Sequence, residues 1–161
     1  MPVLDVTKDP ANLTLTVTAA FPHPPERVWQ IWADPRQLER WWGPPSWPAT
    51  VVDHDLSVGG RVNYFMTGPA GEKAAGWWQF TQIDAPRSLE FDDGFSKDSG
   101  EPDTSMPTMH IRTSLAPTDD GTLMTIVTTF NSTEQMEQLS QMGMEEGMRQ
   151  AAGQIDAILV G

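Results

Sequence analysis

The chain has 161 residues, no cysteine, and ten Lys and Arg against 22 Asp and Glu, which gives a formal net charge of −12 at pH 7. This length suits a single domain with its own core. The negative charge argues against nucleic acid and membrane surfaces as partners, because it repels phosphate groups. The absence of cysteine excludes disulfides and thiolate chemistry.

The beginning of the chain carries Asp5, Lys8 and Asp9 and lacks the apolar run of a signal peptide. No later segment reaches the roughly 18 uninterrupted apolar residues of a membrane span. We therefore expect a cytoplasmic protein in which residues 1–12 form a flexible tail.

The predicted elements begin with a strand over residues 13–21, where apolar residues alternate with threonines. Pro25 suits the first turn of a following helix, and Asp34 suits the N-cap of a second short helix that leads to Trp41 and Trp42. These helices are short, so the three tryptophans 41, 42 and 47 cannot all be buried, and we expect one at the mouth of a pocket.

The middle of the chain is typical of antiparallel hairpins, because short alternating segments are separated by Gly, Pro and Asp turns. The predicted strands cover residues 49–54, 61–67, 73–83, 88–92, 108–115 and 123–130. Residues 92–107 are rich in Asp, Ser, Gly and Pro, which predicts a long mobile loop.

The end of the chain is predicted to be helical. Ser132 and Gln135 form a capping box for a short helix. Over residues 143–160 apolar residues recur every three or four positions, which predicts one long amphipathic helix. A sheet with one apolar face needs a cover, so we expect an α+β fold in which the sheet wraps this helix.

Several motifs resemble one family. The segment PPERVWQIWADPRQLERWWGPP at 24–45, the segment DLSVGGR at 55–61 and the segment MGMEEG at 142–147 are similar to the family named after the activator of heat-shock-protein-90 ATPase, within the SRPBCC superfamily. This resemblance implies a START-like helix-grip fold, a curved antiparallel sheet around the last helix with a cavity between them, and it links the protein to the stress response.

Two differences from the family bear on function. The family commonly has Trp after the Glu-Gly pair, where this chain has Met148, so the resemblance implies a larger or softer cavity here. The eukaryotic activator also has a separate domain that docks on the chaperone, for which this chain has no room. We therefore do not carry chaperone activation over.

A small hydrophobic or aromatic ligand is the expected partner of the cavity, with Tyr64 and Gln82 as polar anchors. A homodimer remains open. The expected lining combines the covered face of the strands with the last helix, and it consists of Trp42, Tyr64, Met66, Trp78, Phe80, Gln82, Phe91, Met109, Ile111, Met144 and Met148.

Three alternatives remain open. The same side chains would also pack a solid core without a cavity. A polyketide cyclase-like enzyme would need one or two polar groups in the cavity, such as Tyr64 or Gln82; Glu90 lies on the wrong side of its strand. A protein-interaction module would use the Met-rich stretch at 136–148 as a soft surface.

Catalytic, metal and cofactor motifs are missing from the sequence. In Asp53-His54-Asp55 the imidazole and the two carboxylates point to opposite faces of a strand, which is poor for chelation. His110 is out of phase with its apolar neighbours and is expected on the outer face of the sheet. We predict no metal, no cofactor and no catalytic residue, and we consider a binding protein the better interpretation than an enzyme.

Overall fold

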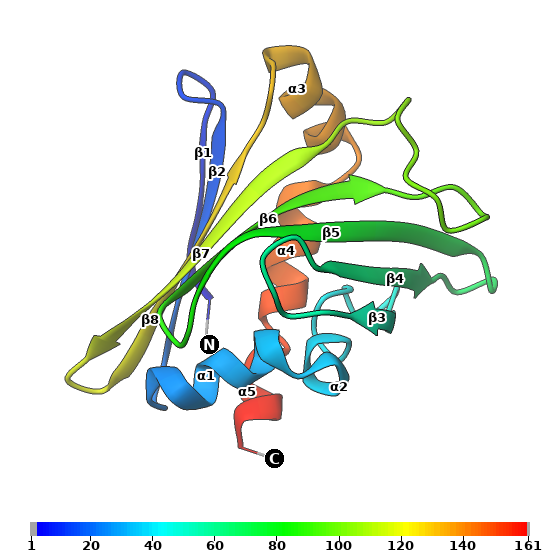
Figure 1. Ribbon diagram of the computed structural model, residues 1–161. Coiled ribbons are helices and arrows are strands. Elements are labelled where there is room, and N and C mark those ends of the chain that lie inside the picture. The colour runs from blue at the N-terminus through cyan, green and yellow to red at the C-terminus, as the bar shows by residue number, and fades with distance from the viewer. Residues whose placement is uncertain (1–2, 161) are drawn as a thin grey trace.

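The computed structural model describes residues 3–160. It contains one sheet of eight strands in the order β1-β2-β8-β7-β6-β5-β4-β3, and every neighbouring pair is antiparallel (Figure 1). The strands are β1 Val3–Asp9, β2 Thr14–Phe21, β3 Ala49–His54, β4 Arg61–Thr67, β5 Lys73–Asp84, β6 Ser88–Phe95, β7 Met109–Thr118 and β8 Gly121–Thr129.

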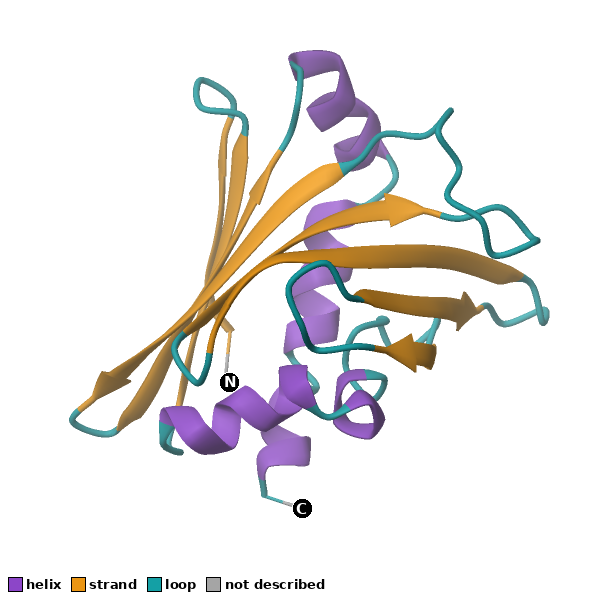
Figure 2. Ribbon diagram, in the orientation of Figure 1, coloured by secondary structure: helices purple, strands orange, loops and turns teal. Residues whose placement is uncertain are grey.

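Helices lie against one face of the curved sheet and at its two ends (Figure 2). They are α1 Pro25–Ala33, α2 Pro35–Leu38, α3 Thr133–Gln141, α4 Met144–Ala152 and α5 Ile155–Leu159. The helix α4 crosses behind the sheet, α1, α2 and α5 gather at one end, and α3 lies at the other. This is the α+β helix-grip arrangement that the sequence predicts. No helix among the described residues combines the length and the apolar character needed to cross a bilayer.

Helix starts follow the capping residues of the sequence. The Asp34 carboxylate accepts a hydrogen bond from the backbone N–H of Arg36 at the start of α2, and Ser132 accepts one from that of Gln135 at the start of α3. The Gln135 side chain in turn accepts a hydrogen bond from the backbone N–H of Asn131. These contacts satisfy amide groups that have no partner within the helix.

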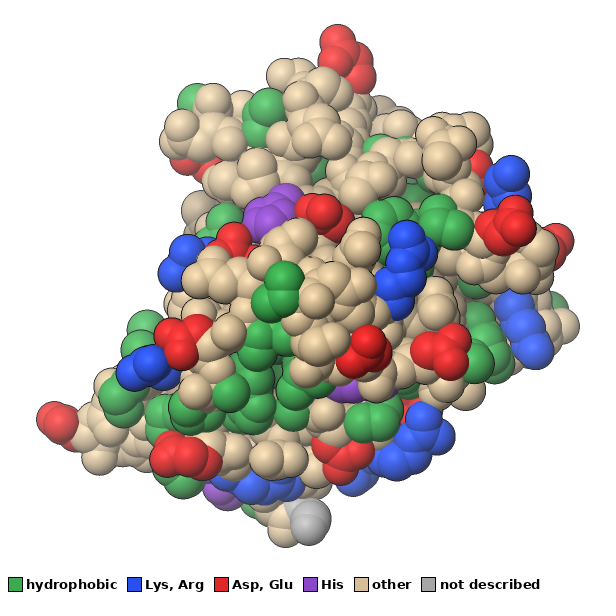
Figure 3. All heavy atoms as spheres, viewed as in Figure 1, with side chains coloured by type: hydrophobic (Ala, Val, Ile, Leu, Met, Phe, Trp, Pro, Cys, Tyr) green, Lys and Arg blue, Asp and Glu red, His purple; other side chains and the backbone are tan. Residues whose placement is uncertain are grey.

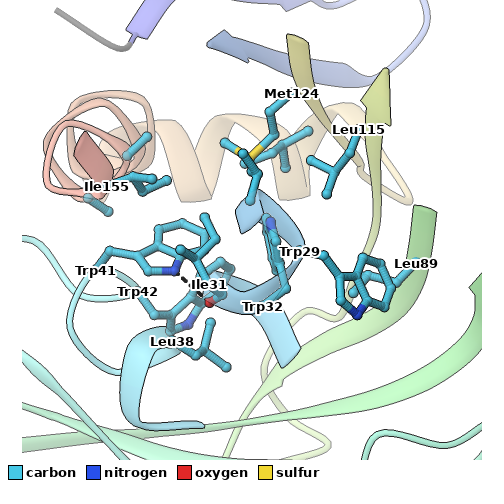
Figure 4. Close-up of a cluster of buried hydrophobic side chains, with 14 of the residues drawn as sticks. Trp29, Ile31, Trp32, Leu38, Trp41, Trp42, Leu89, Leu115, Met124 and Ile155 are labelled. Carbon is cyan, nitrogen blue, oxygen red and sulfur yellow. Dashed lines mark hydrogen bonds between the residues drawn. The ribbon is translucent and has the colours of Figure 1, made fainter. Parts of the chain in front are cut away.

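The side chains between the sheet and the helices form two clusters. The main core cluster joins the inner face of β2–β8 with α1, α4 and α5, and several aromatic rings lie in it (Figure 4). In it the Trp41 indole N–H donates a hydrogen bond to the carbonyl oxygen of Ile31. The second core cluster lies near α3 and consists of Leu15, Met109, Phe130, Met136 and Leu139.

The N-terminal segment differs from the expected flexible tail. Residues 3–9 form β1, an edge strand that pairs with β2, and Val6 packs against both core clusters. Residues 1–2 of the expected tail lie outside the described part. The sequence did not reveal this strand because the segment shows little apolar alternation. Backbone hydrogen bonds to β2 hold it in place, and such bonds need no particular pattern of side chains.

The C-terminal helix is interrupted, contrary to the single helix expected over 143–160. The helix α4 ends at Ala152, and α5 begins at Ile155. Gly153 has a low helix propensity, and the neighbouring Gln154 donates from its side-chain amide to the carbonyl oxygen of Gly43 at 2.7 Å. A tertiary hydrogen bond thus forms where the helix is weakest.

The segment at 92–107 is also shorter as a loop than expected. The strand β6 continues to Phe95, because Gly94 and Phe95 pair with Trp77 and Gly76 of β5. The remaining loop is drawn together by a bridge between Ser96 and Pro102. Strand pairing therefore overrides the turn propensity of Asp92 to Gly94.

Candidate functional site

The expected cavity lining is largely core. Trp78, Phe80, Phe91 and Ile111 are all at most 1 % exposed, and the Trp78 and Phe91 rings stack with 3.9 Å between their centroids. Trp32, Trp41 and Trp42 fill the space beside them, with rings from 4.6 to 6.2 Å apart in edge or tilted contacts. This packing favours the solid-core alternative for the centre of the inner face. Both Trp41 and Trp42 are buried, and Trp47 is half-buried.

Gln82 is exposed on the outer face and is not a pocket anchor. A β-bulge between Phe80 and Gln82 shifts the alternation by one residue, so that Gln82 stands opposite Glu90. A shift of one residue moves every later side chain to the other face of a sheet. The prediction for Gln82 was wrong for this reason.

The four methionines of the expected lining are divided between the two clusters, and Met66 packs against the main core cluster. Met109 belongs to the second core cluster, and Met144 of α4 packs against it. Met148, one turn later, packs against the main core cluster. Met136 is 1 % exposed and therefore cannot serve the interaction surface expected at 136–148, where Met142 is 58 % exposed.

A polar group lies within the aromatic wall at one side of the inner face. We call Tyr64, Asp93, Trp42 and Trp78 the inner polar centre. The Tyr64 hydroxyl donates a hydrogen bond of 3.2 Å to the Asp93 carboxyl, which is 6 % exposed. Tyr64 and the neighbouring Met66 on β4 are only partly buried, so the inner polar centre lies close to the surface.

The electrostatics of this pair follow from its burial. Removal from water raises the pKa of the Asp93 carboxyl to about 7, although the hydrogen bond from Tyr64 lowers it in part. Burial, together with the nearby Asp93 charge, raises the pKa of the Tyr64 phenol well above its ordinary value. At neutral pH the phenol is therefore protonated, and the carboxyl is close to its midpoint.

Two indole groups complete the inner polar centre. The side-chain N–H groups of Trp42 and Trp78 have no hydrogen-bond partner among the described residues, although both are buried. Burial and Asp93 raise the pKa of the Tyr64 phenol, and the two indoles lower it only in part. The Trp42 and Trp78 rings are 4.6 Å apart at 83°, and each lies within 6.4 Å of the Tyr64 ring. The inner polar centre thus has donors that its own acceptors do not satisfy.

Asp93 was not predicted as a site residue. The sequence placed it at the start of a loop, because it stands among the turn residues Asp92 and Gly94. The available signal was the alternation of Leu89, Phe91 and Asp93, which puts the three side chains on one face once the strand is extended to residue 95. A carboxylate in phase with buried residues indicates a buried charge.

The histidines lie outside the inner polar centre. His110 is on the outer face, as its phase predicts, and its ring nitrogens lie 2.9 Å from Asp92 Oδ1 and 2.9 Å from Glu90 Oε1. Burial alone would lower the pKa of His110. The hydrogen bonds and charges of Asp92 and Glu90 raise the pKa by more than burial lowers it, so the net shift is upward. Charged groups are spread over this face of the sheet, which Figure 3 shows toward the viewer.

The segment Asp53-His54-Asp55 is not arranged as a metal site. The His54 ring nitrogen lies 3.0 Å from the carbonyl oxygen of Trp32, and the Asp53 carboxylate accepts from the Asn63 side chain. Within residues 3–160 no group of three or more acidic, His or Cys side chains is placed to hold a metal ion.

A groove of about 880 Å³ lies beside β3, β4 and β5 and is bordered by the loop after β6. Its lining reaches Tyr64 of the inner polar centre and Gly76, and it also includes Asp53, Asn63, Phe65, Lys73, Asp98 and Glu101. The Lys73 ammonium group lies 4.4 Å from the centre of the Phe65 ring. This groove is wide and open, and it is distinct from the cavity expected between the sheet and the last helix.

Comparisons with known proteins cover nearly the whole chain. Residues 22–160 match the family described as Activator of Hsp90 ATPase homolog 1-like protein. A comparison with curated proteins finds no match. A solved protein from Arthrobacter aurescens is 54 % identical with a TM-score of 0.94, and the similarity covers 98 % of this chain and 92 % of that one.

Two further solved structures extend the similarity. Protein Ms6760 from Mycobacterium smegmatis is 53 % identical with a TM-score of 0.90, over 98 % of this chain and 97 % of that one. A protein from Staphylococcus epidermidis is 28 % identical with a TM-score of 0.83, over 97 % and 93 %. The matched residues 22–160 include β3 to β8, the C-terminal helices and all four side chains of the inner polar centre. The chain therefore belongs to the Activator of Hsp90 ATPase homolog 1-like family.

Proposed function

We propose that the protein binds a small molecule with an apolar or aromatic body on the inner face of the sheet, beside Tyr64 and Met66. The observation that carries this proposal is the inner polar centre. A buried N–H group without a partner costs about 1–3 kcal/mol, and two such groups stand here beside a buried carboxyl. A ligand that supplies a hydrogen-bond acceptor would remove that cost and would place its ring among aromatic side chains.

The surroundings of the inner polar centre suit adaptation to a ligand. Met66 and Met148 are partly buried at the edge of the main core cluster. Methionine side chains are flexible and polarisable, so they can change rotamer to admit a flat molecule. In this proposal the ligand opens its own space beside Tyr64 and Met66, so binding does not need the large preformed cavity expected from the sequence.

Ligand uptake can be tested by native mass spectrometry of the purified protein and of the Met66→Trp variant. A bulky indole beside Tyr64 is expected to fill the space that the ligand would take and to reduce uptake of an aromatic adduct at least tenfold. Met142→Trp is the matched control, because Met142 is exposed and lies away from the sheet. Equal uptake by both variants contradicts a site beside Met66.

A second candidate function is proton transfer, and the Asp93 carboxyl favours it. A general base works best when its pKa is near the working pH, and that of Asp93 is about 7. In this reaction the Asp93 carboxylate takes a proton from the carbon next to a ketone, and the enolate oxygen accepts hydrogen bonds from the indole N–H groups. Deuterium exchange into an enolisable diketone, followed by NMR, tests it: the wild type accelerates exchange and Asp93→Asn does not.

A further inference from the structure

The hydroxyl group of Tyr64 already occupies the inner polar centre in the way a ligand would. It donates to Asp93 at 3.2 Å, and its ring lies 6.3 and 6.4 Å from the rings of Trp42 and Trp78, whose indole N–H groups have no hydrogen-bond partner among the described residues. A phenol hydroxyl has one proton to donate and lone pairs to accept. A ligand that satisfies the Asp93 carboxyl and the two indole N–H groups therefore needs one donor and at least one acceptor on the same atom or functional group.

Tyr64 is the most exposed member of the inner polar centre. Trp78 is fully buried and stacked on Phe91, whereas Tyr64 is only partly buried. The phenol lies directly over Gly76 of β5, where a Cβ atom would come within 2.4 Å of the Tyr64 hydroxyl oxygen. A glycine at this position lets a planar ring lie close against the backbone, and a ligand ring can use the same surface as the Tyr64 phenol.

We propose that the ligand recognised here is a phenol or an enol whose hydroxyl replaces that of Tyr64, donating to Asp93 and accepting from the indole N–H groups of Trp42 and Trp78. This inference rests on the proposed function, because it names the chemical class of ligand that the inner polar centre selects. Tyr64 acts as the internal occupant that the ligand displaces.

Other ligand classes fit the inner polar centre less well. A carboxylate has no proton to donate to Asp93, and the two groups repel each other once the pH exceeds the Asp93 pKa of about 7. An ammonium group has no lone pair for the two indole N–H groups. A methyl ether accepts hydrogen bonds but cannot donate to Asp93, so it measures the contribution of the hydroxyl alone.

The test compares 2-naphthol with 2-methoxynaphthalene by titration calorimetry. At pH 8 the Asp93 carboxyl is mostly ionised, and hydrogen bonds to charged groups contribute about 1.5–3 kcal/mol. At this pH the wild type is expected to bind 2-naphthol at least about tenfold more tightly than the ether. Asp93→Asn is expected to reduce this preference to threefold or less. The matched control is Asp92→Asn, the same change one residue away on the outer face, and it is expected to keep the wild-type preference.

A second variant gives the opposite change. Tyr64→Phe removes the competing hydroxyl, so it is expected to strengthen binding of 2-naphthol severalfold and to leave binding of the ether unchanged. The indole N–H signals of Trp42 and Trp78 should shift downfield in ¹H–¹⁵N spectra when 2-naphthol binds. Equal affinity for the two probes in the wild type overturns the phenol inference while the proposed function stands. Failure of both probes to bind overturns the proposed function as well.

Discussion

At the residue scale, Asp93 is a carboxyl group held in an aromatic wall with one hydrogen bond, from Tyr64. Burial of a carboxylate with so little compensation is unfavourable, and this raises the pKa of Asp93 to about 7, so the folded protein keeps the proton up to about that pH. Tyr64 is the titratable residue that faces it, while Glu90, Asp92 and His110 lie on the opposite face of the sheet.

The pH dependence of stability follows from this shift. Between the ordinary pKa of 3.8 and about 7 the unfolded chain has lost the Asp93 proton and the folded protein retains it. Stability from this group is thus complete below about pH 4 and is lost as the pH rises toward 7, by up to about 4 kcal/mol at 1.36 kcal/mol per pH unit.

Asp93→Asn removes that titration and keeps the side-chain shape. We expect the variant to be more stable than the wild type at pH 8 by about 2–4 kcal/mol and to differ from it by less than about 1 kcal/mol at pH 4. Urea unfolding of both proteins from pH 4 to 8 measures the difference, in which the other carboxylates cancel. Two parallel pH profiles would contradict a buried titrating carboxyl.

At the element scale, two glycines on different elements have opposite roles. A Cβ on Gly76 in β5 would come within 2.4 Å of the Tyr64 hydroxyl and 3.1 Å of the Gly94 carbonyl oxygen. A Cβ on Gly147 in α4 would have no atom within 4 Å. The strand glycine makes room for Tyr64, whereas the helix glycine only adds flexibility to α4.

The same substitution at these positions is expected to change stability in opposite directions. Gly76→Ala should lower the free energy of unfolding by about 1–3 kcal/mol, because the methyl group displaces the Tyr64 side chain. Gly147→Ala should raise it by about 0.5–1 kcal/mol, because alanine is the better helix former. Urea midpoints of the two variants check this, and a change of the same sign in both would show that the two glycines are equivalent.

At the scale of the whole molecule, β1 closes one edge of the sheet and joins the two core clusters through Val6. Deletion of residues 1–10 should therefore lower the free energy of unfolding by about 3 kcal/mol or more, because backbone hydrogen bonds and apolar contacts are lost together. It should also expose the edge of β2. Hydrogen exchange measures this directly: the β2 amides that pair with β1 should lose protection, while those of β5 and β6 keep it. Unchanged protection of the β2 amides would contradict the pairing of β1 with β2 and would favour the flexible tail expected from the sequence.

The sequence by itself determined most of the elements and the fold class. Proline at 25, the cap at Asp34 and the capping box at Ser132 are local signals, and the structure places helices at all three. The strands at 49–54 and 61–67 have the predicted bounds, since alternation and glycine turns act over a few residues. The covering of an apolar sheet by the last helices followed from the same patterns.

Tertiary structure decided the features that depend on distant partners. Only the pairing of β6 with β5 shows that Asp93 is a buried strand residue, and only the bulge after Phe80 turns Gln82 outward. The hydrogen bond from the Gln154 side chain to the Gly43 carbonyl oxygen lies at the break in the last helix. In each case a contact with another element decides the outcome, and the local signals that exist, such as the phase of Asp93 and the low helix propensity of Gly153, are too weak to decide it alone. The inner polar centre depends on such contacts throughout, because its four side chains come from β4, β5, β6 and the segment after α2.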